Sequence, residues 1–321
     1  MTRDRVKCTR VLPRKLEGHY DDWDAMLRHT YSAMLHEDPT RIGCCLTIKN
    51  TPKVKDLDHM CQFLFEELDV PRVRLETEAR LQMLSTGKTA GLVVDAGYAY
   101  TVVTPVLDGY ALSHTVPRAT VGGGAALMRL TKGAAEAKWG VRLDDKAVEV
   151  VLEEAGYCSV LAPSNGGPRR PPEQAAMLST LQLPDGHKVE VIDDVCMAPS
   201  EVLFGSKGGV GGHLVTATLK AVNGVHRPQQ EQMWNNVQLV GGLSQLPGYK
   251  ARVTSELNTD TRLMTRPTVY GHDDCSNATF LGASILCSLP GSSVEECFTK
   301  ASYDEWGPSG YFRFCAPFSN C

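Results

Sequence analysis

Apolar residues recur at steps of three and four along residues 21–36, and this spacing predicts an amphipathic helix. Asp21 or Asp22 can cap its start. The same periodicity predicts helices over 54–70 and 76–88. The apolar face of the first helix would carry Trp23, Met26, Leu27, Tyr31, Met34 and Leu35.

Short β-prone runs lie between these helices. Residues 41–50 are apolar and favour a strand, and "PRVRLE" from residue 71 begins another. The segment "AGLVVDAGYAYTVVTPV" (90–106) contains two β-prone runs joined by a turn. Strands that alternate with helices and then form a hairpin favour an α/β layer structure.

The second half continues this alternation. A glycine turn opens a helix over 122–140, and residues 144–161 predict a helix that runs into a strand. Residues 162–176 are rich in Pro, Gly and Arg and predict a loop. The remaining elements are a hairpin over 179–193, helices over 210–222, 248–258 and 278–289, a buried strand before Gly241-Gly242, and a close approach at Gly282-Ala283.

Composition narrows the class of protein. The chain has 321 residues, enough for two domains or one large bilobed domain, and its net charge of −4 argues against a general nucleic-acid binder. We expect no membrane span and no signal peptide, because no apolar run is long enough and the N-terminus lacks an apolar core. The basic N-terminal segment is either a solvated tail or a docking arm for an acidic partner.

Cysteine and histidine usage gives no sign of a metal or catalytic centre. The 11 cysteines are scattered without a CxxC pair, so we expect neither a zinc site nor a disulfide framework, and a reducing compartment. His19, His213 and His272 have no Ser or Cys partner at a suggestive spacing. We therefore interpret these histidines as ordinary polar residues.

Four segments occur in an order and at a spacing typical of one family. They are "VVDAGYAYTVVTPVLDGYALSH", "LQLPDGHKVEVIDDVCMAPSEVLF", "NNVQLVGGLSQLPGYKARVTSEL", and "FLGASILCSL" followed by "KASYDEWGP". Together they resemble the actin and actin-related protein family, and the resemblance covers about residues 10–312. It implies an α/β, actin-like (ribonuclease H-like) fold of two lobes, with mixed sheets flanked by helices that face a cleft.

The resemblance also implies a domain order. It consists of a basic segment (1–17), part of the first large-lobe domain (18–85), the second-lobe core with its phosphate hairpin (86–121), a small insertion domain (122–208), the second-lobe core with the adenosine-loop motif (209–277), and a segment that returns to the first lobe (278–321). The family's first phosphate hairpin and most of its small lobe have no counterpart before Gly18. We therefore expect an N-terminally truncated fold, or a gene model that starts too late.

The nucleotide site implied by the resemblance is degraded. Residues that replace the family's functional groups are Glu78, Tyr98, Ala99, Val102, Glu149, Leu152 and Ser276. Residues that match it are Asp95, Gly97, Thr101, Gly123, Glu153, Gly241 and Gly242. Losing even one pre-aligned electrostatic group often costs about 100-fold or more in rate. We expect no catalytic residue, negligible hydrolysis, no metal site, and ATP or ADP binding (with Mg if bound) that is weak or lost.

Two interpretations of the matching residues stay open. Asp95 and Gly97 either form a hairpin turn retained for folding or contact a nucleotide, and adenosine could still stack on Gly241-Gly242. The family's hydrophobic groove, which receives amphipathic helices of partners, aligns with Leu84, Gly87, Thr89, Leu286 and Leu289. These positions are either such a groove or simply core-adjacent.

Three functions are consistent with this sequence. The first is a non-catalytic structural subunit of a cytoskeletal, ciliary or motor-associated complex in the cytoplasm. The second is a nuclear actin-related subunit of a chromatin remodeller. The third is an ATP-binding, ATP-hydrolysing actin-like protein with an incomplete gene model. We expect protein partners, possibly actin-family or microtubule-associated subunits, and no direct contact with nucleic acid or membrane.

Overall fold

The computed structural model describes residues 20–49, 53–116, 121–161, 171, 179–205, 214–259, 265–272, 274–289 and 297–314. The basic N-terminal segment, most of the predicted 162–176 loop, His19 and His213 lie outside the described residues. The chain divides into two compact units, one of Met1–Thr77 with Cys287–Cys321 (unit 1) and one of Glu78–Leu286 (unit 2). The six-part division expected from the sequence stays a prediction.

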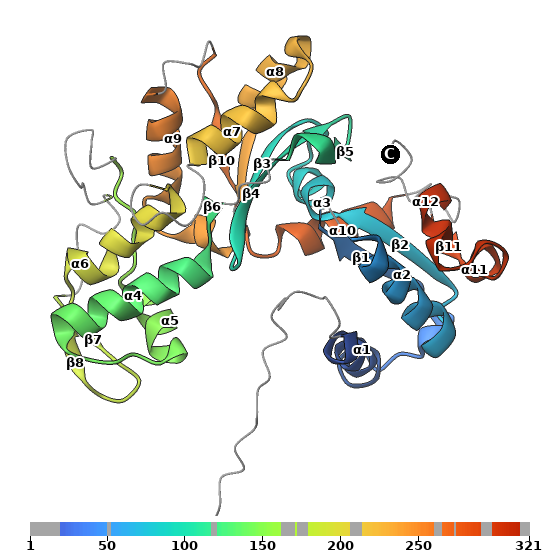
Figure 1. The fold of residues 1–321 in the computed structure, drawn as a ribbon, viewed down its shortest axis with the longest axis horizontal. Helices are drawn as coiled ribbons and strands as arrows, with labels where there is room; N and C mark the ends of the chain where they lie inside the picture. The colour runs from blue at the N-terminus through green and yellow to red at the C-terminus, as the bar shows by residue number, and fades with distance from the viewer. Residues whose placement is uncertain are drawn as a thin grey trace, which may run out of the picture. The chain divides into compact units, whose positions relative to one another are not determined.

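Unit 1 is built on a mixed three-stranded sheet. Strands β1 (Cys44–Ile48) and β2 (Arg72–Thr77) are parallel, and β11 (Phe298–Thr299) joins β2 antiparallel. Helices α1 (Tyr20–His29), α2 (Val54–Gln62), α11 (Lys300–Trp306) and α12 (Tyr311–Phe314) complete it (Figure 1). The sheet, these helices and the turns that follow α1 and α2 share one apolar core.

Both long helices of unit 1 end differently from the prediction. After α1 and after α2 the chain continues as π-helical turns, Thr30–Leu35 and Phe63–Glu67. Leu27 and Tyr31 are buried as predicted, but Met26, Met34 and Leu35 are 41%, 68% and 53% exposed. The predicted apolar face of the first helix is therefore only partly buried. The wider π turn shifts the residues that follow it, a change that a pattern of three- and four-residue steps does not reveal.

Unit 2 is built on a mixed six-stranded sheet of order β10-β9-β3-β4-β5, with β6 paired to β4. Its strands are β3 (Gly91–Ala96), β4 (Tyr100–Leu107), β5 (Tyr110–Ala111), β6 (Val121–Gly122), β9 (Val237–Val240) and β10 (Val269–Gly271). Strands β3, β9 and β10 are parallel, whereas β4 returns antiparallel from β3.

Helices cover both faces of this sheet (Figure 1). Leu92 and Val94 of β3 face a core shared with α7 (Leu214–Asn223), α8 (Arg227–Trp234) and α9 (Tyr249–Thr259). Val93 faces the opposite core, with α3 (Glu78–Ser85) and α10 (Ala278–Ser288). Because successive strand residues alternate between faces, Asp95 lies on the same face as Val93, toward α3.

A separate apolar core in unit 2 is formed by α4 (Gly124–Trp139), α5 (Asp145–Glu154), α6 (Asp193–Cys196) and the hairpin of β7 (Thr180–Gln182) and β8 (Lys188–Glu190). The predicted hairpin and both helices are confirmed. The strand predicted at the end of 144–161 is wrong. Tyr157 N–H donates to Cys196 O and Cys158 N–H to Pro247 O, so this segment bonds to the end of α6 and to the turn before α9 instead of to a neighbouring strand.

The α/β class with mixed sheets flanked by helices is thus confirmed. Among the described residues no helix is both long and apolar enough to span a bilayer.

Candidate functional site

The carboxyl ends of two parallel strands of unit 2 lie side by side. Asp95, near the end of β3, is in register with Val240, the last residue of β9, and the turns that follow carry Gly97 and Gly241. In open α/β sheets, ligands bind outside the carboxyl ends of such strands. The structure therefore brings several of the predicted nucleotide residues to one sheet edge.

Asp95 is held by a side chain that sequence reasoning missed. Gln82, on α3, donates from Nε2 to Asp95 Oδ2 at 2.7 Å and to Thr279 Oγ1 at 3.1 Å. Burial raises the pKa of Asp95, and the hydrogen bond from Gln82 partly opposes this. The signal was available in principle, because Gln82 lies four residues after Glu78 on the helix face that meets β3. The carboxylate is thus tied to the helix that packs behind the sheet.

The turn between β3 and β4 is attached to the start of α4. Gly124 N–H donates to Gly97 O at 3.1 Å, and Ala125 N–H donates to Tyr98 O at 2.7 Å. A Cβ added at Gly123 would lie 2.5 Å from Tyr100 N, so only glycine permits this approach. The first amides of a helix are the groups that attract an anion. In this protein two of these amides, those of Gly124 and Ala125, already donate to carbonyl oxygens of the hairpin turn.

In the loop after β9, one glycine is packed as closely as Gly123, whereas the next has free space around it. Gly241 has φ +85°, and a Cβ there would lie 2.5 Å from both Ala96 O and Asp95 Oδ1. Gly242 is exposed, and its nearest neighbour would be Ser276 Oγ at 3.8 Å. Gly241 thus closes the loop onto β3, and Gly242 leaves a surface next to Ser276.

Two other predicted site residues lie elsewhere. Thr101 is buried and donates from Oγ1 to Gly122 O at 3.1 Å, which fastens β4 to β6. Glu153 lies on α5 and is exposed. The described contacts join neither side chain to Asp95, and their roles toward a nucleotide stay predictions.

The predicted partner groove is divided between the two units. Leu84, Gly87, Thr89 and Leu286 belong to unit 2, and Leu289 belongs to unit 1. Leu286 is buried, Leu84 is partly buried, and Gly87 and Thr89 are exposed. In unit 2, α10 packs against α3 so closely that a Cβ at Gly282 would lie 1.9 Å from Leu81 O. The close approach predicted at Gly282-Ala283 is therefore confirmed at Gly282.

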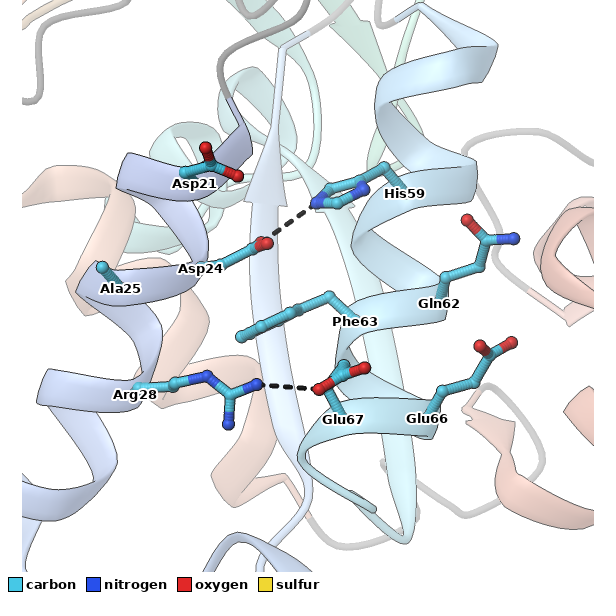
Figure 2. A pocket seen from close by; sticks show the side chains of 9 residues that line it. All are labelled: Asp21, Asp24, Ala25, Arg28, His59, Gln62, Phe63, Glu66 and Glu67. Carbon is cyan, nitrogen blue, oxygen red and sulfur yellow. Dashed lines mark hydrogen bonds and ion pairs between the residues drawn. The ribbon is translucent and has the colours of Figure 1, made fainter.

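Unit 1 has a pocket of about 510 Å³ between α1 and α2. Figure 2 shows that two pairs cross it: His59 Nε2 lies 3.0 Å from Asp24 Oδ1, and Arg28 Nη2 lies 3.0 Å from Glu67 Oε2. The Arg28 guanidinium also lies 5.0 Å from the centre of the Phe63 ring. Because these ion pairs are partly exposed, each stabilises the contact between the two helices only weakly. Acidic side chains are the largest group in the pocket lining, which also includes the ring of Phe63.

Comparison with known proteins identifies the fold. The family model described as "Actin" matches residues 4–141 and 137–315, nearly the whole chain. The chain is also 26% identical over 329 aligned residues to "Actin-like protein 9" of Homo sapiens, covering 96% of this chain and 76% of that protein. The chain belongs to the actin family. The predicted resemblance to divergent actin-related proteins is thereby confirmed.

Members of the actin family usually bind a nucleotide with Mg. The phosphate end of this actin-family hairpin does not fit that group well, because Tyr98 stands at its tip, 40% exposed, and Asp95 is held by Gln82. Among the described residues no group of three or more His, Cys, Asp and Glu is arranged to hold a metal ion. Among the described residues of the β9 loop, Gly242 leaves an exposed surface beside Ser276.

One histidine of this actin-family chain has a partner that the sequence spacing hid. His272 Nε2 lies 3.1 Å from Ser85 Oγ, although 187 residues separate them. Ser85 Oγ donates to Gln82 O, and Asp274 N–H donates to His272 Nδ1, so the Ser85 hydroxyl accepts from Nε2. The absence of a Ser partner at a suggestive spacing in the sequence does not exclude this pair, because its two residues are distant along the chain. The pair is oriented to join α3 to the β10 loop, and its serine proton is directed away from the imidazole.

Proposed function

We propose that this actin-family chain is a non-catalytic structural subunit of a multiprotein complex of the cytoskeletal, ciliary or motor-associated kind, in the cytoplasm. The observation that carries the proposal is the hydrogen bond from Gln82 to Asp95. It holds the acid of the phosphate hairpin against the protein's own core, with a raised pKa, instead of presenting it to a ligand.

Phosphoryl transfer requires a metal, a phosphate cradle and a water placed together. Here the turn carries Tyr98 and Ala99 in place of an acid and a glycine, and Val102 stands opposite Asp95 on β4. Each change weakens the electrostatic field that a nucleotide's phosphates would meet. Exposed apolar side chains on the π-helical turn after α1 and on α10, such as Met34 at 68% and Phe280 at 72%, support contacts with protein partners.

Calorimetry with ATP-Mg and ADP-Mg, together with an ATP turnover assay, tests the non-catalytic part. We expect no micromolar binding and no turnover above background. The matched variant Tyr98→Asp with Ala99→Gly restores the family-like turn, and measurable binding by this variant alone would locate the defect in the hairpin. Micromolar ATP affinity or ATP turnover in the unaltered protein would overturn the proposal.

A second candidate is a nucleotide-binding actin-like protein, favoured by the exposed Gly242 beside Ser276 at the end of β9. Adenosine could lie on this surface without a metal. Competition between adenosine and ATP in the same calorimetric assay separates binding at this surface from binding at the hairpin.

Affinity purification with mass spectrometry from the native source tests the partner class. Recovery of microtubule or actin machinery supports the proposal. Recovery of a chromatin-remodelling ATPase, together with nuclear localisation, would replace it with the nuclear alternative.

A further inference from the structure

The pocket between α1 and α2 has an excess of negative charge. Its lining holds four carboxylates, those of Asp21, Asp24, Glu66 and Glu67, and among its basic side chains the guanidinium of Arg28. A volume of about 510 Å³ lies within the range of sites that hold small ligands. The pocket therefore has both the room and the charge for a cation.

Not all of these carboxylates are engaged within the protein. His59 and Arg28 pair with one each, and the Tyr303 hydroxyl donates to Glu66. Asp21 lies in the first turn of α1, is exposed, and forms no ion pair with another described residue. A cation that enters the pocket therefore meets an acid whose charge no described side chain neutralises.

One arginine side chain already lies in the pocket and shows which chemistry fits it. The Arg28 guanidinium lies 5.0 Å from the centre of the Phe63 ring and 3.0 Å from Glu67 Oε2 (Figure 2). An aromatic face beside a carboxylate is a favourable setting for a guanidinium or an ammonium group. The occupant that suits the rest of the lining is therefore a Lys or Arg side chain.

The chain supplies a basic segment that is joined to the rim of this pocket. Residues 1–19 lie outside the described residues and contain six Lys and Arg residues against two acids. The segment ends where α1 begins, at Tyr20, and the Tyr20 ring stacks on the His59 ring of the pocket lining with centroids 3.9 Å apart. Its last basic residues, Arg14 and Lys15, are thus six and five positions from the rim.

The reach of the segment matches the size of the pocket. An extended chain spans at most about 3.6 Å per residue, so five residues can cover about 18 Å. Along α1, the rise from Asp21 to Arg28 is about 10 Å. Arg14 and Lys15 can therefore reach the whole length of the pocket.

We propose that residues 1–19 dock on this pocket of the same chain, with Arg14 and Lys15 beside Asp21 and Glu67. The contact depends on ionic strength, because salt screens interactions between exposed charges. The docked segment occupies the pocket that a basic segment of another protein would enter. Such a partner would first have to displace the chain's own N-terminal segment.

Limited trypsin digestion of the full chain tests the docking, because a docked segment is cleaved more slowly than a free one. Mass spectrometry follows the rate of cleavage after Arg14 and Lys15, beside a synthetic peptide of residues 8–22 in the same digest. At about 50 mM salt, where screening is weak, we expect cleavage of the protein to be slower than that of the peptide. Asp21→Asn should raise the rate about threefold, the order of effect of one exposed ion pair.

Asp22→Asn is the matched control for Asp21→Asn. Asp22 is exposed in the same first turn of α1 but does not line the pocket, so the rate should stay that of the unaltered protein. Raising the salt to about 500 mM should bring the unaltered protein close to the peptide, because the range of the attraction then falls to a few ångströms. Thermal unfolding of both variants verifies that they fold.

Carbodiimide coupling, which joins an amine directly to a carboxylate, locates the contact in the unaltered protein. We expect a link from Lys15 to Glu66 or Glu67, identified by mass spectrometry after digestion. Mixing isotope-labelled and unlabelled chains shows whether the link forms within one copy. This measurement decides the proposal even if Asp21→Asn does not fold.

Three outcomes would overturn the proposal. The first is cleavage of the unaltered protein as fast as that of the peptide, or equally accelerated by Asp22→Asn. The second is coupling of Lys15 only to carboxylates outside the pocket. The third is a link between labelled and unlabelled copies, which would make a second copy the occupant.

Discussion

Two of the β-hairpins of unit 2, β3–β4 and β7–β8, have an aspartate and a glycine in or next to the turn, and these residues lie in different surroundings. At the β7–β8 turn, Gly186 has φ +90° with no atom within 4 Å of an added Cβ, and the backbone amide of His187 lowers the pKa of exposed Asp185. At the β3–β4 turn, burial raises the pKa of Asp95, and Gly123 and Gly241 close in on the backbone.

The difference separates two reasons for keeping a turn residue. At the β7–β8 turn, glycine serves the local backbone conformation alone. Around the β3–β4 turn, the glycines let α4 and the β9 loop approach the hairpin within contact distance. Those glycines are required by packing whether or not a nucleotide is bound, so their presence in the sequence is weak evidence for a ligand.

The largest expected effect tests the tight loop. Gly241→Ala places a methyl group 2.5 Å from Ala96 O, at a φ of +85°. Combined backbone strain and overlap should lower the free energy of unfolding by about 3 kcal/mol or more. Urea unfolding measures the loss. Gly242→Ala is the matched control, since its nearest neighbour would be 3.8 Å away, and an equal loss there would show that the tight contacts are not the cause.

A smaller effect tests the buried acid. Gln82→Leu removes the donor to Asp95 and should destabilise the protein by about 2 kcal/mol at pH 7, the cost of a buried carboxylate left without that partner. Urea unfolding at several pH values measures it.

The sign of the pH dependence of this destabilisation follows from the direction in which the pKa of Asp95 is shifted. Because the folded pKa of Asp95 is raised above the ordinary value of 3.8, the penalty is absent below that value and grows as pH rises through the folded pKa. Asp95→Asn should remove this pH dependence in the Gln82→Leu background. A penalty that does not change with pH would contradict the assignment to Asp95.

The smallest effect tests the open turn. Gly186→Ala meets no neighbouring atom, so only the positive φ opposes it, and the loss should be about 1 kcal/mol. A shift in the midpoint of thermal unfolding measures it. A loss as large as that of Gly241→Ala would remove the distinction between the two hairpins.

Local patterns in the sequence were sufficient for most elements of the fold. Apolar periodicity located α2, α3, α7, α9 and α10, and the alternating runs around Gly97 and around Gly186 located both hairpins. The order of four motifs, and not the strength of any one of them, indicated the family, and the match of the family model confirmed it.

What the sequence did not reveal depends on distant partners. The segment of Tyr157 and Cys158 was predicted as a strand because it is apolar, but its amides bond to Cys196 and Pro247, which no local pattern indicates. The same holds for Ser85 with His272. Gln82 and Asp95 are only 13 residues apart in the sequence. Even so, their hydrogen bond could be predicted only if the face of β3 that packs against α3 were known.

The contact between Gly282 and Leu81 O has a consequence for spectroscopy. With no side chain between them, α3 and the first turns of α10 cannot slide or tilt against each other without a backbone clash. Phe280 lies two residues earlier on α10 and is 72% exposed, so it is accessible for labelling. A fluorophore at that position would therefore report the motion of the helix pair as one body, and its anisotropy would change when a partner slows that body.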